Sequence, residues 1–287
     1  MRRSLFIISL LIPFGSTVAG VQRYAASEHE SSWNTSSSRL YCSLSHEIPI
    51  YGRVVFERAA GEELQMSVEV KQKPLNVGSA RVLSLAPSWK HDARERDLGK
   101  VSYVMAQTPF KLDQALARRF LAELEKGMFP TLSYKDWSDG RDEVQVSLSS
   151  VNLHRALGEF FDCLTSQLPY SFDYVRESRI AFGFDSSELS ATAKQRLDEV
   201  AEYMLEDRDV GRITLEGRTD NVGYRRYNEA LAKRRSEAVR NYLIEKGIEP
   251  SRLQISSKLY GERNPIASNR SSQGRALNRT VEVTLSK

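Results

Sequence analysis

The chain has 287 residues, of which 40% are hydrophobic and 27% are charged. This composition is typical of globular proteins and excludes the fibrous, disordered and low-complexity classes. The 41 basic residues are nearly balanced by 37 acidic ones, and the resulting net charge of +4 on a mixed surface argues against a nucleic-acid-binding protein. The length predicts about two domains.

The first twenty residues have the pattern of a secretory signal peptide. Two arginines precede an apolar run from Leu5 to Phe14, and small residues follow up to Gly20. A membrane-spanning helix needs roughly 20 apolar residues, so a permanent membrane anchor is disfavoured. An acylated lipoprotein is disfavoured as well, because the first cysteine after the expected cleavage point is Cys42. We expect residues 1–20 to be removed and the mature chain to have no transmembrane segment.

Export makes the two cysteines, Cys42 and Cys163, informative. An oxidising compartment favours disulfides, and two thiols allow only one pairing within the chain. The alternative is a pair of buried free thiols. The four histidines share no ligand spacing with either cysteine, so we expect no metal site and no cofactor.

Residues 21–168 are predicted to form a first domain of mainly antiparallel β structure, resembling a barrel or a sandwich, with two helices. Apolar-alternating runs separated by Gly, Pro and charged turns occur at residues 54–56, 64–70, 81–85, 101–105 and 144–148. One helix is expected from Asp113, as its N-cap, to Lys126, with Gly127 ending it. A second is expected over residues 152–168. Residues 169–175 then form a hinge.

Residues 176–287 alternate between strand and helix and predict a two-layer α/β domain of order β-α-β-α-β-β. The first strand carries Ile180, Phe182 and Phe184 at a period of two, and Ser190 opens the helix after it. A further strand ends at Gly217, and the next helix ends at Gly247. Two shorter strands complete the domain.

The helix that ends at Gly247 has two polar residues, Asn228 and Arg235, on its core-facing stripe. A buried guanidinium needs a partner, and Asp220 lies in the turn after the preceding strand. At the carboxyl end of a strand, such a pair would line a crevice and suit a zwitterionic amino acid, since the carboxylate binds an ammonium and the guanidinium binds a carboxylate. The alternative is a purely structural Asp–Arg ion pair.

These residues carry a resemblance to a known family. The run GRTDNVGYRRYNEALAKRRSEAVRNY at residues 217–242, followed by GIEPSRL, YGERNP and GRALNRTVEV, closely resembles the OmpA-like peptidoglycan-binding domain. The resemblance implies that the domain over residues 176–287 binds the diaminopimelate of the cell-wall stem peptide, with Asp220 holding the amine and Arg235 the carboxylate. Around this pocket it places Asn228, Thr219, Asn221 and Arg279.

The sequence departs from that family at three positions. Arg218 stands where His or Tyr is common, Ala232 replaces a usual Ser, and Thr280 replaces a second Arg. These positions flank the expected pocket, so the departures concern affinity more than binding itself.

The first domain resembles the MotY family of flagellar motor proteins through YCSLSHEIPIYGRVVF at residues 41–56, LEKGMFPTLSYKDW at 124–137, VSLSSV at 146–151 and FDC at 161–163. The resemblance implies a periplasmic protein whose residues 21–168 dock to the flagellar basal body, where it helps to build the T ring. It also implies that the second domain anchors the motor and its stator to peptidoglycan. MotX and B-type stator subunits are the further partners implied. Cys42 and Cys163 fall where that family has its disulfide.

Two other functions are alternatives. A generic OmpA-like envelope anchor would tie the outer membrane or an envelope complex to the cell wall. Such an anchor would be expected to have an acylated cysteine or a membrane barrel. An enzyme is disfavoured because no nucleophile motif or histidine cluster is visible, so no catalytic residue is assigned. The aromatic-rich segment Phe129 to Trp137 fits turn packing, with a docking surface as its alternative.

Overall fold

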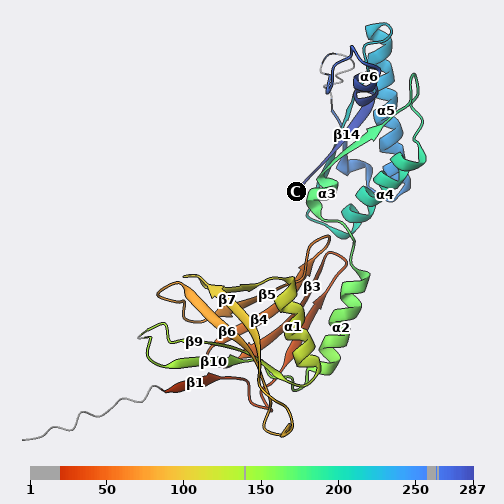
Figure 1. Cartoon of the computed structure of the whole chain (residues 1–287). Coiled ribbons are helices and arrows are strands. Elements are labelled where there is room, and N and C mark those ends of the chain that lie inside the picture. Colours follow the sequence, from red (N-terminus) through yellow and green to blue (C-terminus); the bar gives the residue numbers. More distant parts are fainter. Residues whose placement is uncertain (1–19, 139, 257–262, 264) are drawn as a thin grey trace, which may run out of the picture. The chain divides into compact units, whose positions relative to one another are not determined.

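The structure is a computed structural model, and it describes residues 20–138, 140–256, 263 and 265–287. The predicted signal peptide, apart from Gly20, lies outside the described residues. By its internal contacts the chain divides into two units (Figure 1). Among the described residues, the first unit contains those up to Asn34, Ser45–Phe56 and Gln65–Ala156, and the second contains Thr35–Leu44, Glu57–Leu64 and Leu157–Lys287. Among the described residues, no helix is both long enough and apolar enough to span a membrane.

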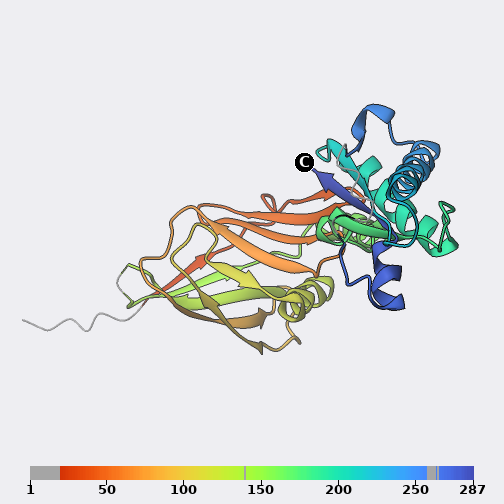
Figure 2. The same cartoon turned by 90° about the horizontal axis from the view of Figure 1, so that it is seen from above.

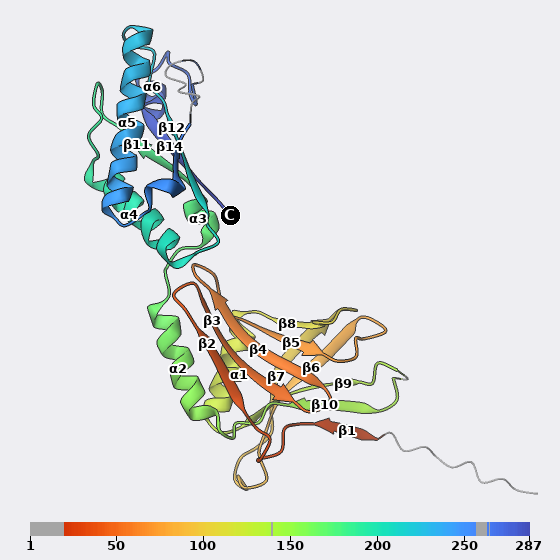
Figure 3. The ribbon, with the colours of Figure 1, turned by 180° about the vertical axis from the view of Figure 1, so that it is seen from behind.

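The first half of the chain forms one ten-stranded sheet, which curves like half a barrel (Figures 1 and 3). Its order is β1-β10-β9-β6-β7-β8-β5-β4-β3-β2, and of the described pairings only β1 with β10 is parallel. This confirms the predicted class, although several strands were not foreseen. The strands are β1 (Val21–Tyr24), β2 (Trp33–Ser37), β3 (Tyr41–Ile48), β4 (Gly52–Ala59), β5 (Gln65–Val70), β6 (Gly78–Leu85), β7 (Arg96–Tyr103), β8 (Phe110–Leu112), β9 (Phe129–Lys135) and β10 (Glu143–Ser147). Figure 2 shows these strands, in red to green, running alongside one another.

Both helices predicted for this half are present. Helix α1 (Gln114–Glu125) begins at the predicted N-cap, because the Asp113 carboxylate accepts a hydrogen bond from the Leu116 N–H at 2.9 Å. It ends before Gly127, whose φ of 73° is a conformation that glycine adopts readily. Helix α2 (Leu153–Ser166) buries Leu153, Leu157 and Phe160.

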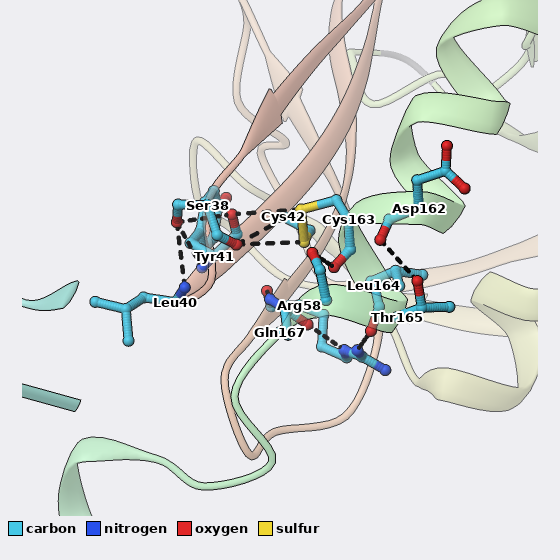
Figure 4. Close-up of a disulfide and its surroundings, with 11 residues drawn as sticks. Ser38, Leu40, Tyr41, Cys42, Arg58, Asp162, Cys163, Leu164, Thr165 and Gln167 are labelled. Carbon is cyan, nitrogen blue, oxygen red and sulfur yellow. Dashed lines mark hydrogen bonds between the residues drawn. A yellow bond between two sulfur atoms is a disulfide. The ribbon is translucent and has the colours of Figure 1, made fainter. Parts of the chain in front are cut away.

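The predicted disulfide joins Cys42 on β3 to Cys163 on α2 (Figure 4). The two Cα atoms are 5.9 Å apart, and the bridge spans 121 residues of sequence. Next to it, the Arg58 guanidinium donates hydrogen bonds to the Leu164 carbonyl and to the Gln167 side chain. The end of α2 is therefore tied to the sheet both covalently and by charge-assisted hydrogen bonds.

The second half forms a four-stranded sheet in the order β11-β14-β12-β13, with helices α4 and α5 lying together along it (Figures 1 and 3). The elements are α3 (Phe172–Arg176), β11 (Glu177–Ala181), α4 (Ala191–Glu206), β12 (Arg212–Gly217), α5 (Arg225–Glu245), a 3-10 turn (Pro250–Arg252), β13 (Leu253–Ile255), α6 (Ser272–Asn278) and β14 (Thr280–Ser286). The predicted α/β class is confirmed. Helices α3 and α6 were not predicted.

Apolar side chains of the helices and the sheet meet in one core. Leu197 and Val200 of α4 and Val239 of α5 are buried against Ile213 and Leu215 of β12. Burying each such side chain stabilises the fold by roughly 1.5–3 kcal/mol. This packing holds α5 across the end of β12, where the candidate site lies.

Candidate functional site

The site lies where β12 ends and α5 crosses it. A Cβ atom on Gly217, the last residue of β12, would lie only 2.3 Å from the Ala232 carbonyl oxygen on α5. Only glycine therefore allows this close approach of helix and strand. The approach brings the turn with Thr219 and Asp220 next to the α5 side chains Asn228 and Arg235, and all four residues are buried.

Arg235 is fully buried, and its guanidinium is held by backbone carbonyls. Its Nε donates to the Ser186 oxygen at 2.8 Å, one terminal nitrogen donates to the Gly183 oxygen at 2.9 Å, and the other donates to the Arg218 oxygen at 3.1 Å. A guanidinium has five N–H groups, so two remain without an acceptor among the described residues. Burial lowers the pKa of Arg235 to about 10, with the attraction of Asp220 opposing it and the positive charge of Arg279 adding to it. The side chain is therefore charged at neutral pH.

Asp220 makes its ion pair with Arg279, not with Arg235. The Arg279 guanidinium lies 3.0 Å from one carboxylate oxygen of Asp220, and the other oxygen accepts a hydrogen bond from the Val222 N–H at 3.2 Å. Asp220 and Arg235 therefore do not form the purely structural ion pair that was the alternative interpretation, because three backbone carbonyls bind the Arg235 guanidinium and Asp220 pairs with Arg279. Asp220 still lies close enough to influence the pKa of Arg235.

These side chains line a cavity of about 210 Å³. Asn228 donates to the Asp220 carbonyl at 3.3 Å and so fixes the turn against α5. The Thr219 hydroxyl oxygen is buried and has no hydrogen-bond partner among the described residues. Asn221 is exposed and is not part of the lining. The cavity is lined by Phe184, Asp185, Thr219, Asp220, Val222, Gly223, Tyr227, Asn228, Leu231, Arg235 and Arg279.

The cavity has an apolar rim that sequence reasoning missed. Phe184 was expected on the first strand of the domain, but β11 ends at Ala181, and Phe184 is 66% exposed beside the cavity. Tyr227 lies on the same rim, and its hydroxyl donates a hydrogen bond to the Asp185 carboxylate. The sequence signal that the strand ends earlier was the turn from Gly183 to Ser186, which interrupts the alternating pattern of the strand.

Of the three departures from the OmpA-like pattern, Arg218 is the best defined. Its side chain forms ion pairs with Glu282 and, at 3.6 Å, with Glu216. It is not part of the cavity lining. Its backbone carbonyl, in contrast, is one of the three acceptors of Arg235. The side chain at this position therefore packs against neighbouring strands, while the main chain contributes to the site.

The fold and this cavity define a protein with a C-terminal domain of the OmpA family, which the sequence matches over residues 181–279. Residues 24–169 match the family described as the MotY N-terminal domain. The sodium-type flagellar protein MotY of Vibrio parahaemolyticus is 30% identical over 289 residues, which cover 97% of this chain and 95% of that protein. The chain therefore belongs to the MotY family, as the resemblance of its motifs had predicted.

Two other similar proteins match a smaller part of the chain. Outer membrane protein A of Bordetella avium is 42% identical over 117 residues, which cover 41% of this chain and 59% of that protein. The crystal structure of the C-terminal domain of Helicobacter pylori MotB is 28% identical, covers 38% of this chain and 84% of that chain, and superposes with a TM-score of 0.35.

Proposed function

We propose that the cavity beside Arg235 binds the zwitterionic centre of diaminopimelate in the peptidoglycan stem peptide. The observation that carries this proposal is a fully buried, charged guanidinium with two N–H groups still available next to a cavity. Two parallel N–H groups suit a carboxylate, and such charge-assisted bonds are about twice as strong as neutral ones. A buried cation without a ligand is also costly, which favours an anionic occupant.

The ammonium group of the ligand would bind Asp220. A carboxylate has roughly four lone-pair positions, and among the described residues two of those on Asp220 are used, by Arg279 and by the Val222 N–H. An ammonium can therefore share the carboxylate with Arg279. The Thr219 hydroxyl offers a further polar contact, and Asn228 holds the turn in place. Asn221 would contact the ligand only from outside the cavity.

For the whole chain we propose a non-catalytic, periplasmic component of the flagellar motor, exported by the signal peptide at residues 1–20. Residues 21–168 would dock to the basal body, and residues 176–287 would anchor the motor and stator to the cell wall. Of the hinge predicted at 169–175, the part from Phe172 onward belongs to α3, and Val175 is buried in the core of the second half. The support is the match of residues 24–169 to the MotY N-terminal family and the similarity to a flagellar protein over nearly the full length. MotX and B-type stator subunits are the further partners that we propose for this role.

The binding proposal is tested by co-sedimentation of the purified full chain with isolated sacculi. We expect Arg235→Lys to lower the bound fraction at least about tenfold, because an ammonium cannot present a planar pair of donors. Asp220→Asn should have a comparable effect through the lost ammonium contact. Lys233→Ala is the matched control, since it removes an exposed charge from the same helix outside the cavity. Thermal melting of each variant separates lost binding from lost folding, and normal sedimentation of a folded Arg235→Lys variant would contradict the proposal.

Deletion of the gene tests the motor role. Cells that keep their filaments but do not swim in soft agar would support torque generation as the process that needs this protein. The alternative, a generic envelope anchor, would instead leave swimming intact and make the cells sensitive to detergent.

A further inference from the structure

The first unit contains a larger cavity, of about 470 Å³, that the wall-binding role does not use. It lies between β1, the turn after β3, the end of β5 and the end of β9. Its lining includes Gln22, Tyr24, Ile50, Tyr51, Tyr134 and Trp137. This volume falls in the range of pockets that hold a small ligand or a few side chains.

The walls of this cavity are aromatic and neutral. The rings of Tyr134 and Trp137 stack with their centroids 4.8 Å apart, and those of Tyr24 and Tyr51 lie 5.3 Å apart. The Tyr134 hydroxyl donates to the Tyr51 hydroxyl at 3.0 Å, so these polar atoms already bind one another. Burial raises the pKa of both hydroxyls, which keeps them uncharged. The buried Trp137 Nε1–H has no acceptor among the described residues and leaves one donor in the wall. Such a surface favours an uncharged, mainly apolar occupant.

The rim of the cavity exposes apolar side chains. Ile50 is 79% exposed, and its φ of 69° is unfavourable for a β-branched residue. Leu75, another lining residue, is 70% exposed. The charged residues of the rim, Lys73 and Asp136, have opposite signs and leave no net charge to attract an ion. Exposed apolar groups around an aromatic cavity are typical of an interaction site.

Strand β1 offers a backbone edge next to this cavity. It is the last strand on its side of the sheet, and the Glu143 N–H of β10 donates to the Gly20 oxygen at 2.9 Å. Backbone N–H and C=O groups of successive residues point to opposite edges of a strand. Because Gly20 faces β10, the backbone groups of Arg23, three residues later, point away from β10. No described strand pairs with that outer edge. The side chains of Gln22 and Tyr24 line the cavity, so a strand added beside β1 would place every second side chain on the cavity face.

We infer that this surface binds a short, extended segment of a partner protein, which adds to the outer edge of β1 and places apolar, uncharged side chains in the cavity. The free main-chain groups of β1 select a polypeptide over a lipid, because only another backbone can pair with them. The neutral aromatic walls select the apolar side chains. The inference rests on the proposed docking of the first domain and assigns that docking to one edge and one cavity. The aromatic-rich segment of this chain from Phe129 to Trp137 supplies the stacked rings of Tyr134 and Trp137.

The test uses two substitutions in the full chain, expressed as a fluorescent fusion in a strain that lacks the gene. Arg23→Pro removes the outward N–H and blocks strand addition, and an edge strand tolerates proline where its N–H faces solvent. Its matched control, Arg23→Ala, removes the same side chain but keeps the N–H. Ile50→Asp puts a charge on the rim, at a backbone conformation that Asp tolerates. Its control is Met105→Asp, at a residue that is 60% exposed and outside the lining.

We expect Arg23→Pro and Ile50→Asp each to reduce the fraction of cells with a fluorescent focus at the flagellar base about tenfold or more. The two controls should keep the wild-type fraction. All four variants should keep wild-type sedimentation with sacculi, because that site lies in the other unit. A melting curve of each variant checks that it folds.

The outcomes separate this inference from the proposed function. A wild-type fusion that forms no basal focus would overturn the docking role itself. Wild-type foci together with normal foci for either Arg23→Pro or Ile50→Asp would overturn strand addition and leave the docking role standing. A third outcome concerns vesicles of phosphatidylethanolamine and phosphatidylglycerol. If the purified chain bound them, and if Ile50→Asp abolished this binding while Arg23→Pro preserved it, the cavity would be assigned to lipid and the inference would likewise be overturned.

Discussion

Replacing Gly217 by alanine should damage both the stability of the second half and its cavity. The added Cβ would lie 2.3 Å from the Ala232 carbonyl oxygen and 2.9 Å from its carbon, whereas ordinary contact begins near 3.4 Å. Helix α5 must therefore move by about 1 Å or the strand end must distort, because the neighbour is backbone and cannot rotate away. Overpacking of this kind typically costs about 1–3 kcal/mol.

The same displacement should weaken ligand binding, because α5 carries Asn228 and Arg235. A shift of about 1 Å in a positioned group can cost on the order of a hundredfold in function. We therefore expect Gly217→Ala to melt several degrees below the wild type, at roughly 4 °C per kcal/mol for a domain of about 110 residues, and to sediment weakly with sacculi.

Gly158→Ala is the matched control for this experiment. Gly158 lies within α2, and a Cβ there would have no atom within 4 Å. Alanine in the middle of a helix is more favourable than glycine by roughly 0.5–1 kcal/mol, so this variant should melt at or above the wild-type temperature. If Gly217→Ala melted and sedimented like the wild type, the argument that close backbone packing positions the site would be refuted.

Two further predictions concern the first half of the chain. The double substitution Cys42→Ser and Cys163→Ser should lower the free energy of unfolding by about 4–5 kcal/mol, because the bridge closes a loop of 121 residues. The measurements are a gel mobility of the wild type that changes on reduction and a lowered melting temperature of the double variant. Glu123→Gln should lower stability at neutral pH. Burial raises the pKa of the Glu123 carboxyl, but hydrogen bonds and positive charges from Ser84, Lys126 and Arg96 outweigh the effect of burial. Together they hold this pKa below its ordinary value of 4.5. A carboxyl with a depressed pKa in the folded state stabilises the fold above pH 4.5, and this stabilisation is lost as the pH falls through the folded-state pKa. The melting temperatures of variant and wild type should therefore converge in acid. A difference in melting temperature that stays constant down to pH 2 would contradict this.

Local chemistry explains where sequence reasoning worked. Helix α1 could be predicted because its N-cap, Asp113, and its terminating Gly127 act on neighbouring backbone groups. Strand β9 could not, because one of its pairing partners, β6, comes from a distant part of the chain and nothing within Phe129–Lys135 specifies it; the other partner, β10, is the next strand in the chain. The pairing of the cysteines needed no structure, since two thiols allow only one intramolecular bond.

At the site, the sequence by itself determined that Asp220, Asn228 and Arg235 would meet. The helical period places Asn228 and Arg235 on one face, and the strand ending at Gly217 brings Thr219 and Asp220 to that face. Only the tertiary structure decided how they pair. Arg235 binds the carbonyls of Gly183 and Ser186, which lie 52 and 49 residues away in sequence, and so Asp220 pairs with Arg279 instead. The physical reason is that every residue carries the same backbone carbonyl, so residue types cannot reveal which carbonyls the fold will bring to a buried cation.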